Sequence, residues 1–304
     1  MSQTFNLYLA TDTLAADAQQ LGVTIEDLQN IQVEVIATLA QTAKRTQTEQ
    51  IAQSIEQLEW QLQLDYRVIL PLKSLAAQLH WPTWQSAQVS FADYLWEQTC
   101  LECFLAGTLI DSTVSMNSAI LINRDSKTDI NNADMNKTTA YIEINANPDG
   151  RYALYHFKSY RNPTILPPTP LLQADGQTCA FINWTASDCL ASNGTANPEQ
   201  KSLSEQINPF IDSLTPNITT TKTYLYERSF SFLLSRIHNK EDVINDTDTD
   251  TDTGIDYIHP CVILSFSTTF GTTALYFAPK HASPPDFHNL HYWSVLDKQA
   301  ALAK

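Results

Sequence analysis

Polar side chains that could bind or transform a ligand concentrate in one stretch, residues 141–161. Tyr141, Glu143 and Asn145 alternate there with apolar residues, which places them together on one face of a strand. The turn-forming run Asn-Pro-Asp-Gly at 147–150 follows, and a second alternating run comes after it. The stretch therefore predicts a β-hairpin. Carboxylates, amides and phenols bind hydroxyl groups and other polar ligands, so function is expected on this face.

A sugar-binding site suits these residue types, because such sites combine aromatic platforms with carboxylates and amides in a cleft. Trp96 and Glu102 are an even number of residues apart and would share one face of a strand at 95–106. The candidate patch is Trp96, Glu102, Glu143, Asn145 and Arg161. The alternative is a buried ion-pair network, in which Arg161 neutralises one glutamate and the aromatic residues belong to the core.

Glu102 and Glu143 could instead act as the acid and the base of a glycosidase, which uses two carboxyl groups. The sequence contains no G-x-S-x-G nucleophile motif, no phosphate-binding loop and no H-E-x-x-H zinc motif. We therefore predict a non-enzymatic protein that binds a carbohydrate-like small molecule. A glycan-active hydrolase that uses the two glutamates is one alternative, and a structural or partner-binding module is another.

Cys100 and Cys103 form a C-x-x-C pattern, which is typical of redox and zinc sites. Residues three apart on a strand point to opposite faces, so the two sulfur atoms would share neither a metal nor a disulfide. We expect buried structural thiols, and a redox pair only if the segment is helical.

Two other patterns concern cofactors. Asp248, Asp250 and Asp252 have the spacing of a calcium loop, but threonine occupies the sixth position and histidine the twelfth. This run is expected to be a disordered acidic insertion that could collect calcium weakly. His156 and His288 could provide two axial ligands for haem. No cofactor is predicted, with calcium and haem kept as weak alternatives.

The pattern of elements is that of an all-β protein. Residues 59–70 show the clearest alternation of apolar and polar side chains. Further strands are predicted at 4–10 (an edge strand), 95–106, 118–123, 178–184, 223–238, 259–270 and 272–278. Helices are expected at 11–22, after Thr24, at 41–57 and in the tail, while 31–40 suits either a strand or a helix. Strands without helical crossovers predict an antiparallel β-sandwich or barrel with a few short peripheral helices.

We expect a single domain over residues 1–304, because no linker and no internal repeat divides the chain. The proline-rich segment after the hairpin cannot form a central strand. Polar insertions in the loops of this domain are predicted near 41–57, 124–138, 185–221 and 239–256.

Charge excludes two classes of partner. The 304 residues include 18 Lys and Arg against 33 Asp and Glu, a net charge of −15. Nucleic acid and anionic membrane surfaces require clustered positive charge, so neither is an expected partner. The N-terminus lacks a signal-peptide pattern, and no apolar run approaches the roughly 18 residues of a membrane helix. Five irregularly spaced cysteines suggest no disulfide framework, and we expect a cytoplasmic location.

Three segments resemble, in the same order, segments of bacterial DOMON-like domains, which are related to the family-nine carbohydrate-binding modules. Residues 95–105, LWEQTCLECFL, are similar to the LW-x-x-TC-x-E-x-F segment of that family. Residues 141–161 resemble its Y-x-E-x-N-x-x-P-x-G hairpin, which ends in Y-x-F-x-x-YR. Residues 285–288 are similar to its PDFH segment. The order and the approximate spacing agree from about residue 59 to residue 293.

The resemblance implies a jelly-roll-like β-sandwich whose relatives bind sugars or haem, and it implies no assigned activity. Tyr155, Asp286 and His288 lie in the matched segments and join the candidate residues. The full candidate ligand-binding set is Trp96, Glu102, Glu143, Asn145, Tyr155, Arg161, Asp286 and His288.

Overall fold

The computed structural model describes residues 2–46, 55–111, 136–173, 175–185, 223–234, 254–269 and 271–302. The strands are β1 (Gln3–Ala10), β2 (Gln32–Thr46), β3 (Ile55–Leu70), β4 (Cys100–Ala106), β5 (Tyr141–Ala146), β6 (Tyr152–Phe157), β7 (Asn183–Trp184), β8 (Tyr224–Leu233), β9 (Tyr257–Thr268), β10 (Gly271–Ala278) and β11 (Ser294–Val295). The helices are α1 (Leu14–Leu21), α2 (Ile25–Gln29), α3 (Lys73–Gln78), α4 (Thr108–Asp111) and α7 (Lys298–Ala301), with 3-10 turns η1 (Ser86–Gln88), η2 (Leu95–Glu97) and η8 (Leu290–Tyr292).

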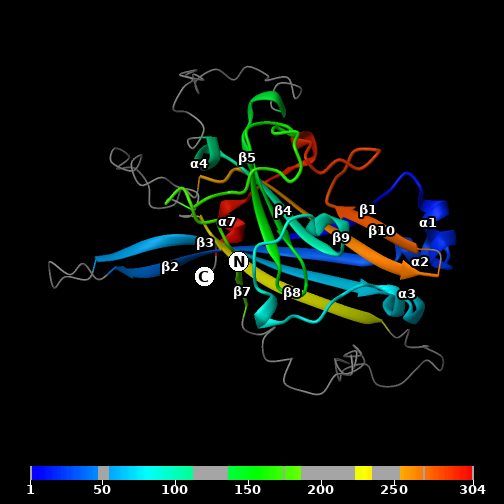
Figure 1. Ribbon diagram of the computed structural model, residues 1–304. Coiled ribbons are helices and arrows are strands. Elements are labelled where there is room, and N and C mark those ends of the chain that lie inside the picture. Colours follow the sequence, from blue (N-terminus) through cyan, green and yellow to red (C-terminus); the bar gives the residue numbers. More distant parts are fainter. Residues whose placement is uncertain are drawn as a thin grey trace, which may run out of the picture.

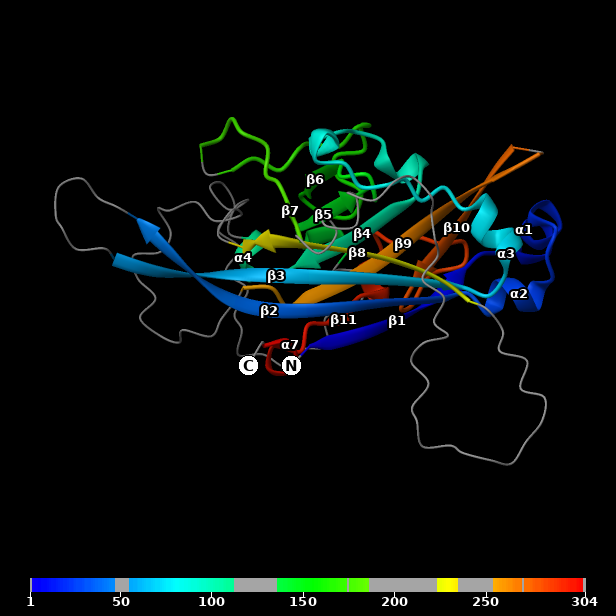
Figure 2. The ribbon, with the colours of Figure 1, turned by 90° about the horizontal axis from the view of Figure 1, so that it is seen from below.

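These strands form one antiparallel sheet in the order β6-β5-β4-β9-β10-β1-β2-β3-β8-β7, and β11 pairs with β9. The sheet is curled into a half-barrel, so strands far apart in this order face one another (Figures 1 and 2). The Tyr66 hydroxyl of β3 donates to the backbone oxygen of Glu102 in β4 at 2.7 Å, across the main core. Side chains of both halves fill that core, among them Val35, Leu64, Leu105, Ile144, Phe230 and Leu264.

A second apolar cluster, the outer cluster, lies on the other face of β4, β5, β6, β9 and β10. Alternation along β4 sends Leu101 and Cys103 into the main core and Cys100 and Phe104 into the outer cluster. The outer cluster includes Leu95, Phe104, Tyr141, Tyr155, Phe157, Phe287, Leu290 and Trp293. Both faces of β4 and β5 are therefore buried, and the polar face of the predicted hairpin lies beneath the C-terminal segment.

Several predicted elements are confirmed. β3 shows the expected alternation, and β5 and β6 pair as a hairpin. β9 and β10 pair as a second hairpin, in which β10 begins at Gly271. Thr24 caps α2 in a reciprocal capping box with Asp27. Residues 31–40 belong to a strand. β1 is present, but it lies between β10 and β2 and is not an edge strand.

The predicted surface helix at 41–57 is wrong for residues 41–46 and 55–57, which belong to strands, while residues 47–54 lie outside the described residues. β2 and β3 remain paired out to Thr46 and Ile55, and they extend past the other strands as a long hairpin (Figure 1). Each further pair of residues adds hydrogen bonds between two strands that are already in register. These interactions outweigh the small helical preference of this polar sequence. The predicted strand at 118–123 and most of the other insertions lie outside the described residues.

Residues 95–106 are not one strand either. Leu95–Glu97 form the 3-10 turn η2, and the strand begins only at Cys100. The even spacing of Trp96 and Glu102 therefore does not put them on a common strand face. Their proximity has another cause, which is the path of the loop before β4.

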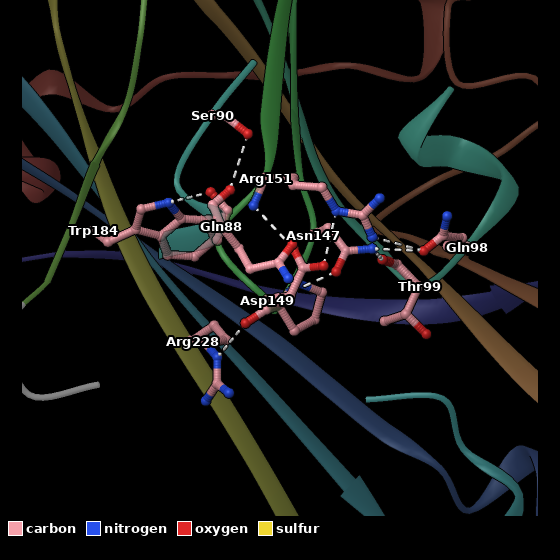
Figure 3. Close-up of polar contacts among 11 residues, drawn as sticks. Gln88, Ser90, Gln98, Thr99, Asn147, Asp149, Arg151, Trp184 and Arg228 are labelled. Atoms are coloured by element: carbon pink, nitrogen blue, oxygen red, sulfur yellow. Dashed lines mark hydrogen bonds and ion pairs between the residues drawn. The ribbon is translucent and has the colours of Figure 1, made fainter. Parts of the chain in front are cut away.

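The turn of the β5–β6 hairpin, at one edge of the sheet, forms hydrogen bonds with β7 and β8 at the opposite edge (Figure 3). Arg228 Nε of β8 donates to the Pro148 backbone oxygen at 3.0 Å, and Trp184 Nε1 of β7 donates to that of Gly150 at 2.9 Å. These bonds connect the hairpin at one end of the sheet with the strands at the other end. They hold the curled sheet closed on this side of the main core.

Side chains within the turn fix its shape. The Asp149 carboxylate accepts hydrogen bonds from the Arg151 backbone N–H at 2.9 Å and from Arg151 Nε at 2.8 Å. Arg151 Nη2 donates to Gln98 at 3.0 Å, and Asn147 Nδ2 donates to the Thr99 backbone oxygen at 3.2 Å. The Asn-Pro-Asp-Gly run is thus a structural anchor, whereas the polar residues before it face the outer cluster.

We expect Gly150→Ala to lower the free energy of unfolding by about 2–4 kcal/mol. Gly150 has a φ of +118°, and an added Cβ would lie 3.2 Å from the Gln85 backbone oxygen and 3.3 Å from Val89 Cγ2. Gly22→Ala is the matched control, because Gly22 has a φ of +69° and open space around it; it should cost about 1 kcal/mol. Urea unfolding of both variants measures the difference, and equal losses would contradict the steric argument.

Candidate functional site

A cavity of about 600 Å³ lies on the outer face of the sheet. Its floor is formed by strands β4, β5, β9 and β10, and Glu102 and Glu143 project from it. Three non-strand segments close the cavity: residues 10–13 after β1, residues 163–168 of the proline-rich segment, and residues 285–288 near the C-terminus. The floor is therefore sheet, while the walls come from segments far apart in the sequence.

Glu102 and Glu143 stand side by side on this floor. In the ladder between β4 and β5, Glu102 is opposite Asn145 and Glu143 is opposite Phe104, so the glutamates are diagonal neighbours on one face. They are 3% and 5% exposed. Burial raises the pKa of Glu143 to about 7. Burial, together with the neighbouring carboxyl of Glu143, raises the pKa of Glu102 well above its usual range. The protonated form of Glu102 is thereby favoured, and Glu143 is near its midpoint at neutral pH.

Glu143 contacts an amide and an imidazole. Asn145 Nδ2 donates to its Oε1 at 2.7 Å, and His288 Nε2 lies 3.8 Å from its Oε2. Burial, with a smaller effect of Arg161, lowers the pKa of His288 to about 3, so this imidazole is neutral and the contact is not an ion pair. The Tyr141 hydroxyl accepts from the backbone N–H of Arg161 at 3.1 Å and lies 2.8 Å from His288 Nδ1. Donation from Tyr141 to Nδ1 leaves the imidazole proton on Nε2, directed at Glu143.

Arg161 pairs with Asp286 and not with either glutamate. Its Nη2 lies 2.9 Å from Asp286 Oδ1, and the Tyr160 hydroxyl donates to the other carboxylate oxygen at 2.7 Å. The alternative of a buried network between Arg161 and Glu102 or Glu143 is therefore wrong. Its partner comes from the C-terminal segment, and the Arg161 side chain remains 51% exposed. Neither glutamate forms an ion pair with Lys or Arg in the described part of the chain, although the charge of Arg161 lowers the pKa of Glu143.

Trp96 reaches the cavity from the 3-10 turn before β4. Its ring packs against Tyr94 and Tyr155, with centroid distances of 5.3 and 5.9 Å. Tyr155 is fully buried, and its hydroxyl donates to Asp93 at 2.8 Å. Tyr155 therefore supports the Trp96 ring and does not itself line the cavity.

Two backbone positions near the site are strained. Tyr94 and Arg161, with φ of 61° and 47°, are the non-glycine residues with positive φ among the described residues. This conformation costs an L-residue on the order of 1 kcal/mol or more. Tyr94 begins the turn that carries Trp96, and Arg161 itself lines the cavity. Such strain concentrates at functional sites, where the surrounding structure maintains it.

The structure brings the predicted residues together in two roles. Those that line the cavity are Trp96, Glu102, Glu143, Arg161 and His288. Those that hold the lining residues are Asn145, which bonds to Glu143, Tyr155, which packs on Trp96, and Asp286, which pairs with Arg161.

The sequence did not predict most of the wall residues. Tyr276 lines the cavity from β10, and its position could have been inferred from alternation in that strand, since Leu275 and Phe277 face the main core. Phe157 could have been inferred in the same way from the hairpin. The loop at 10–13 and the proline-rich wall at 163–168 carry no periodic pattern that would place them.

In the described part of the chain, the cysteine pair and the two histidines do not form a metal or haem site. Cys100 and Cys103 are buried, free and on opposite faces of β4, as predicted. The Phe157 ring packs on His288 at 5.2 Å, so the preceding residue, His156, points to the other side of β6. His156 and His288 therefore cannot bind the same haem iron. The aspartate run considered for calcium lies outside the described residues.

Within the described ranges, no group of three or more His, Cys, Asp or Glu side chains is arranged to hold a metal ion. None of the helices in those ranges is long and apolar enough to cross a membrane. No family model, no curated protein and no solved structure matches this chain.

Proposed function

We propose that this chain binds a carbohydrate-like small molecule in the cavity and does not transform it. The observation that carries the proposal is the composition of the cavity, which combines two buried carboxyls with the aromatic rings of Trp96, Phe157, Tyr276 and Phe287. Sugars present apolar ring faces that pack on aromatic rings, and hydroxyl groups that bind carboxyls and amides. The volume of about 600 Å³ falls within the range of roughly 300–1,000 Å³ usual for small-molecule sites.

The protonation of the two carboxyls on the cavity floor favours a ligand that is rich in hydroxyl groups. A protonated Glu102 can donate one hydrogen bond and accept others, and Glu143 near its midpoint offers both forms. The Nε2 proton of His288 adds a donor beside Glu143. A hydroxyl group, which donates and accepts, finds a complementary partner at each of these positions.

We further propose that the curled sheet is a variant of the jelly-roll-like β-sandwich of DOMON-like domains. Support comes from the three segments that resemble this family, because all of them reach the cavity. The first supplies Trp96 and Glu102, the second Glu143 and Arg161, and the third His288. Free cysteines within the described part, most of them buried, support the cytoplasmic location that belongs to the same proposal.

The arrangement of the glutamates favours binding over hydrolysis. Glycosidases place their two carboxyl groups on either side of the scissile bond. Glu102 and Glu143 instead stand next to each other on adjacent strands of one floor. In this proposal a sugar lies on top of the pair and its glycosidic bond does not lie between the two carboxyls. We therefore prefer a binding protein to a glycan-active hydrolase.

We expect Trp96→Ala to weaken sugar binding about tenfold or more, because loss of an aromatic platform removes about 1.5 kcal/mol. Isothermal titration calorimetry with a panel of neutral mono- and disaccharides would measure this. Trp60→Ala is the matched control, since Trp60 on β3 is also partly buried but packs against the main core. The proposal fails if no sugar binds at millimolar concentration, or if the two variants bind a sugar equally well.

A further inference from the structure

The floor of the cavity has more hydrogen-bond acceptors than the protein satisfies. Glu102 is 3% exposed, and its carboxyl lies near the carboxyl of Glu143 and the thiol of Cys100, a weak donor. Asn145, opposite Glu102 in the ladder, is fully buried, and its Oδ1 has no hydrogen-bond partner. Glu143 accepts a single hydrogen bond, from Asn145. Buried acceptors are normally satisfied, so a ligand rich in donors fits this floor.

Carboxyl groups outnumber cationic groups among the side chains that line the cavity. The titratable side chains that line it are Asp12, Glu102, Glu143, Arg161, Tyr276 and His288. Arg161 is the one permanent cation among these described residues, and Asp286 already neutralises it at 2.9 Å. Ionised Glu102 and Glu143 would therefore lack a direct ion-pair partner, and Glu143 would be stabilised only by the more distant charge of Arg161. A buried carboxylate requires a cationic partner, which a positively charged ligand would supply.

The walls suit a cation as well. The rings of Trp96, Phe157, Tyr276 and Phe287 contribute to the cavity together with the two glutamates. The face of an aromatic ring is negatively polarised and attracts an ammonium group, most strongly where water is excluded. The same rings provide apolar surface for the body of the ligand.

We propose that the ligand of this cavity is an organic ammonium ion of the amino-sugar class. Its ammonium group would lie between Glu102 and Glu143, where its three N–H donors can reach the carboxyl oxygens. Its sugar ring would pack on the aromatic walls. This inference rests on the proposed sugar-binding function and adds the charge of the ligand to it.

Binding of the ammonium ion would release protons. Burial favours the protonated form of Glu102 and raises the pKa of Glu143 to about 7. Below pH 7 the carboxyls therefore hold protons while the cavity is free of ligand. A cation between them favours the carboxylate forms, and the displaced proton passes to the buffer. No bond within the ligand forms or breaks. The other titratable groups that face the pair are Cys100, Tyr141, Tyr155, Arg161, Cys261, Tyr276 and His288.

The test is calorimetric titration of the full chain at pH 6 with glucosamine, N-acetylglucosamine and glucose. Two buffers with different ionisation enthalpies report the number of protons released. We expect glucosamine to bind about tenfold or more tightly than the two neutral sugars, with release of about one proton. Glu102→Gln should reduce the preference to less than about threefold. Glu227→Gln, which removes a carboxyl that is 58% exposed on β8, should leave it unchanged.

Each outcome separates this inference from the sugar-binding proposal. Equal binding of the three sugars without proton release would overturn the ammonium ligand and leave the sugar site in place. Binding of none of them would overturn both. A glucosamine preference that survives in Glu102→Gln, confirmed as folded by circular dichroism, would overturn the position of the ammonium group. If Glu102→Gln does not fold, the number of protons that the unmodified chain releases still tests whether an ammonium ion binds at the carboxyls. Glu143→Gln removes the second carboxyl and tests the position of the ammonium group independently.

Discussion

Replacing Glu143 by glutamine is expected to raise the free energy of unfolding by about 3 kcal/mol above pH 7, and to change it little below about pH 4. Burial raises the pKa of Glu143 to about 7 from its usual value of 4.5. A shift of roughly 2.5 pH units corresponds to about 3 kcal/mol. Glutamine keeps the shape of the side chain and can still accept the hydrogen bond from Asn145.

The direction of the pH dependence follows from proton binding. Between about pH 4.5 and pH 7, the folded chain retains the proton on Glu143 while the unfolded chain has lost it. The folded state therefore binds more protons, and its stability falls as the pH rises through this window. The contribution is fully present below pH 4.5 and is lost once the pH exceeds about 7. The titratable groups facing Glu143 are Cys100, Glu102, Tyr141, Tyr155, Arg161, Cys261, Asp286 and His288.

Urea unfolding of the parent chain and of Glu143→Gln at several pH values between about 4 and 8.5 would measure this effect. The difference between the two proteins reports the loss of the Glu143 carboxyl together with its effect on the pKa of Glu102, which Glu143 raises. Glu227→Gln, on the exposed face of β8, is the matched control for a glutamate-to-glutamine change. A constant difference between parent and Glu143→Gln over the whole pH range would contradict the predicted protonation of the floor.

Trp293→Ala is expected to lower the free energy of unfolding by about 3–5 kcal/mol. Trp293 is 6% exposed, and its ring contacts Phe104 at 5.7 Å, Tyr141 at 5.4 Å and His259 at 6.1 Å between centroids. Its Nε1 donates to the Phe287 backbone oxygen at 2.9 Å. Truncation would leave a void in the outer cluster and remove the bond that folds the C-terminal segment back on itself.

The same substitution should loosen one wall of the cavity, since His288 and Phe287 belong to the segment that Trp293 anchors. Urea unfolding would measure the global loss, and hydrogen exchange across 284–296 would report local release. His291→Ala is the control, because His291 occupies the same 3-10 turn but is exposed. If both variants lose the same stability and exchange alike, Trp293 is not the anchor.

Part of the site was predictable because it is local. Glu143 and Asn145 are two residues apart on one strand, so alternation alone places them on the same face, and the bond between them follows from that neighbourhood. The hairpin turn was predictable for a similar reason, since Asn, Pro, Asp and Gly each favour turn dihedrals. The placement of Cys100 and Cys103 on opposite faces of β4 followed from their spacing of three residues.

The remaining geometry depended on contacts between distant segments. Glu102 meets Glu143 only because the β4–β5 register sets it opposite Asn145, and a shift by one residue would turn it to the main core. Trp96 reaches the cavity from a 3-10 turn that was predicted as strand. Arg161 takes its partner from Asp286, which lies more than a hundred residues further along the chain.

The sequence by itself determined which side chains share a face of each strand and where the hairpin at 147–150 turns, because the strand period of two and the dihedral preferences of turn residues are local properties. Only the tertiary structure decided the strand order, the register that pairs the two glutamates, and the segments that close a cavity over them. Those features depend on how the whole sheet curls and packs, and no pattern within one segment records that packing.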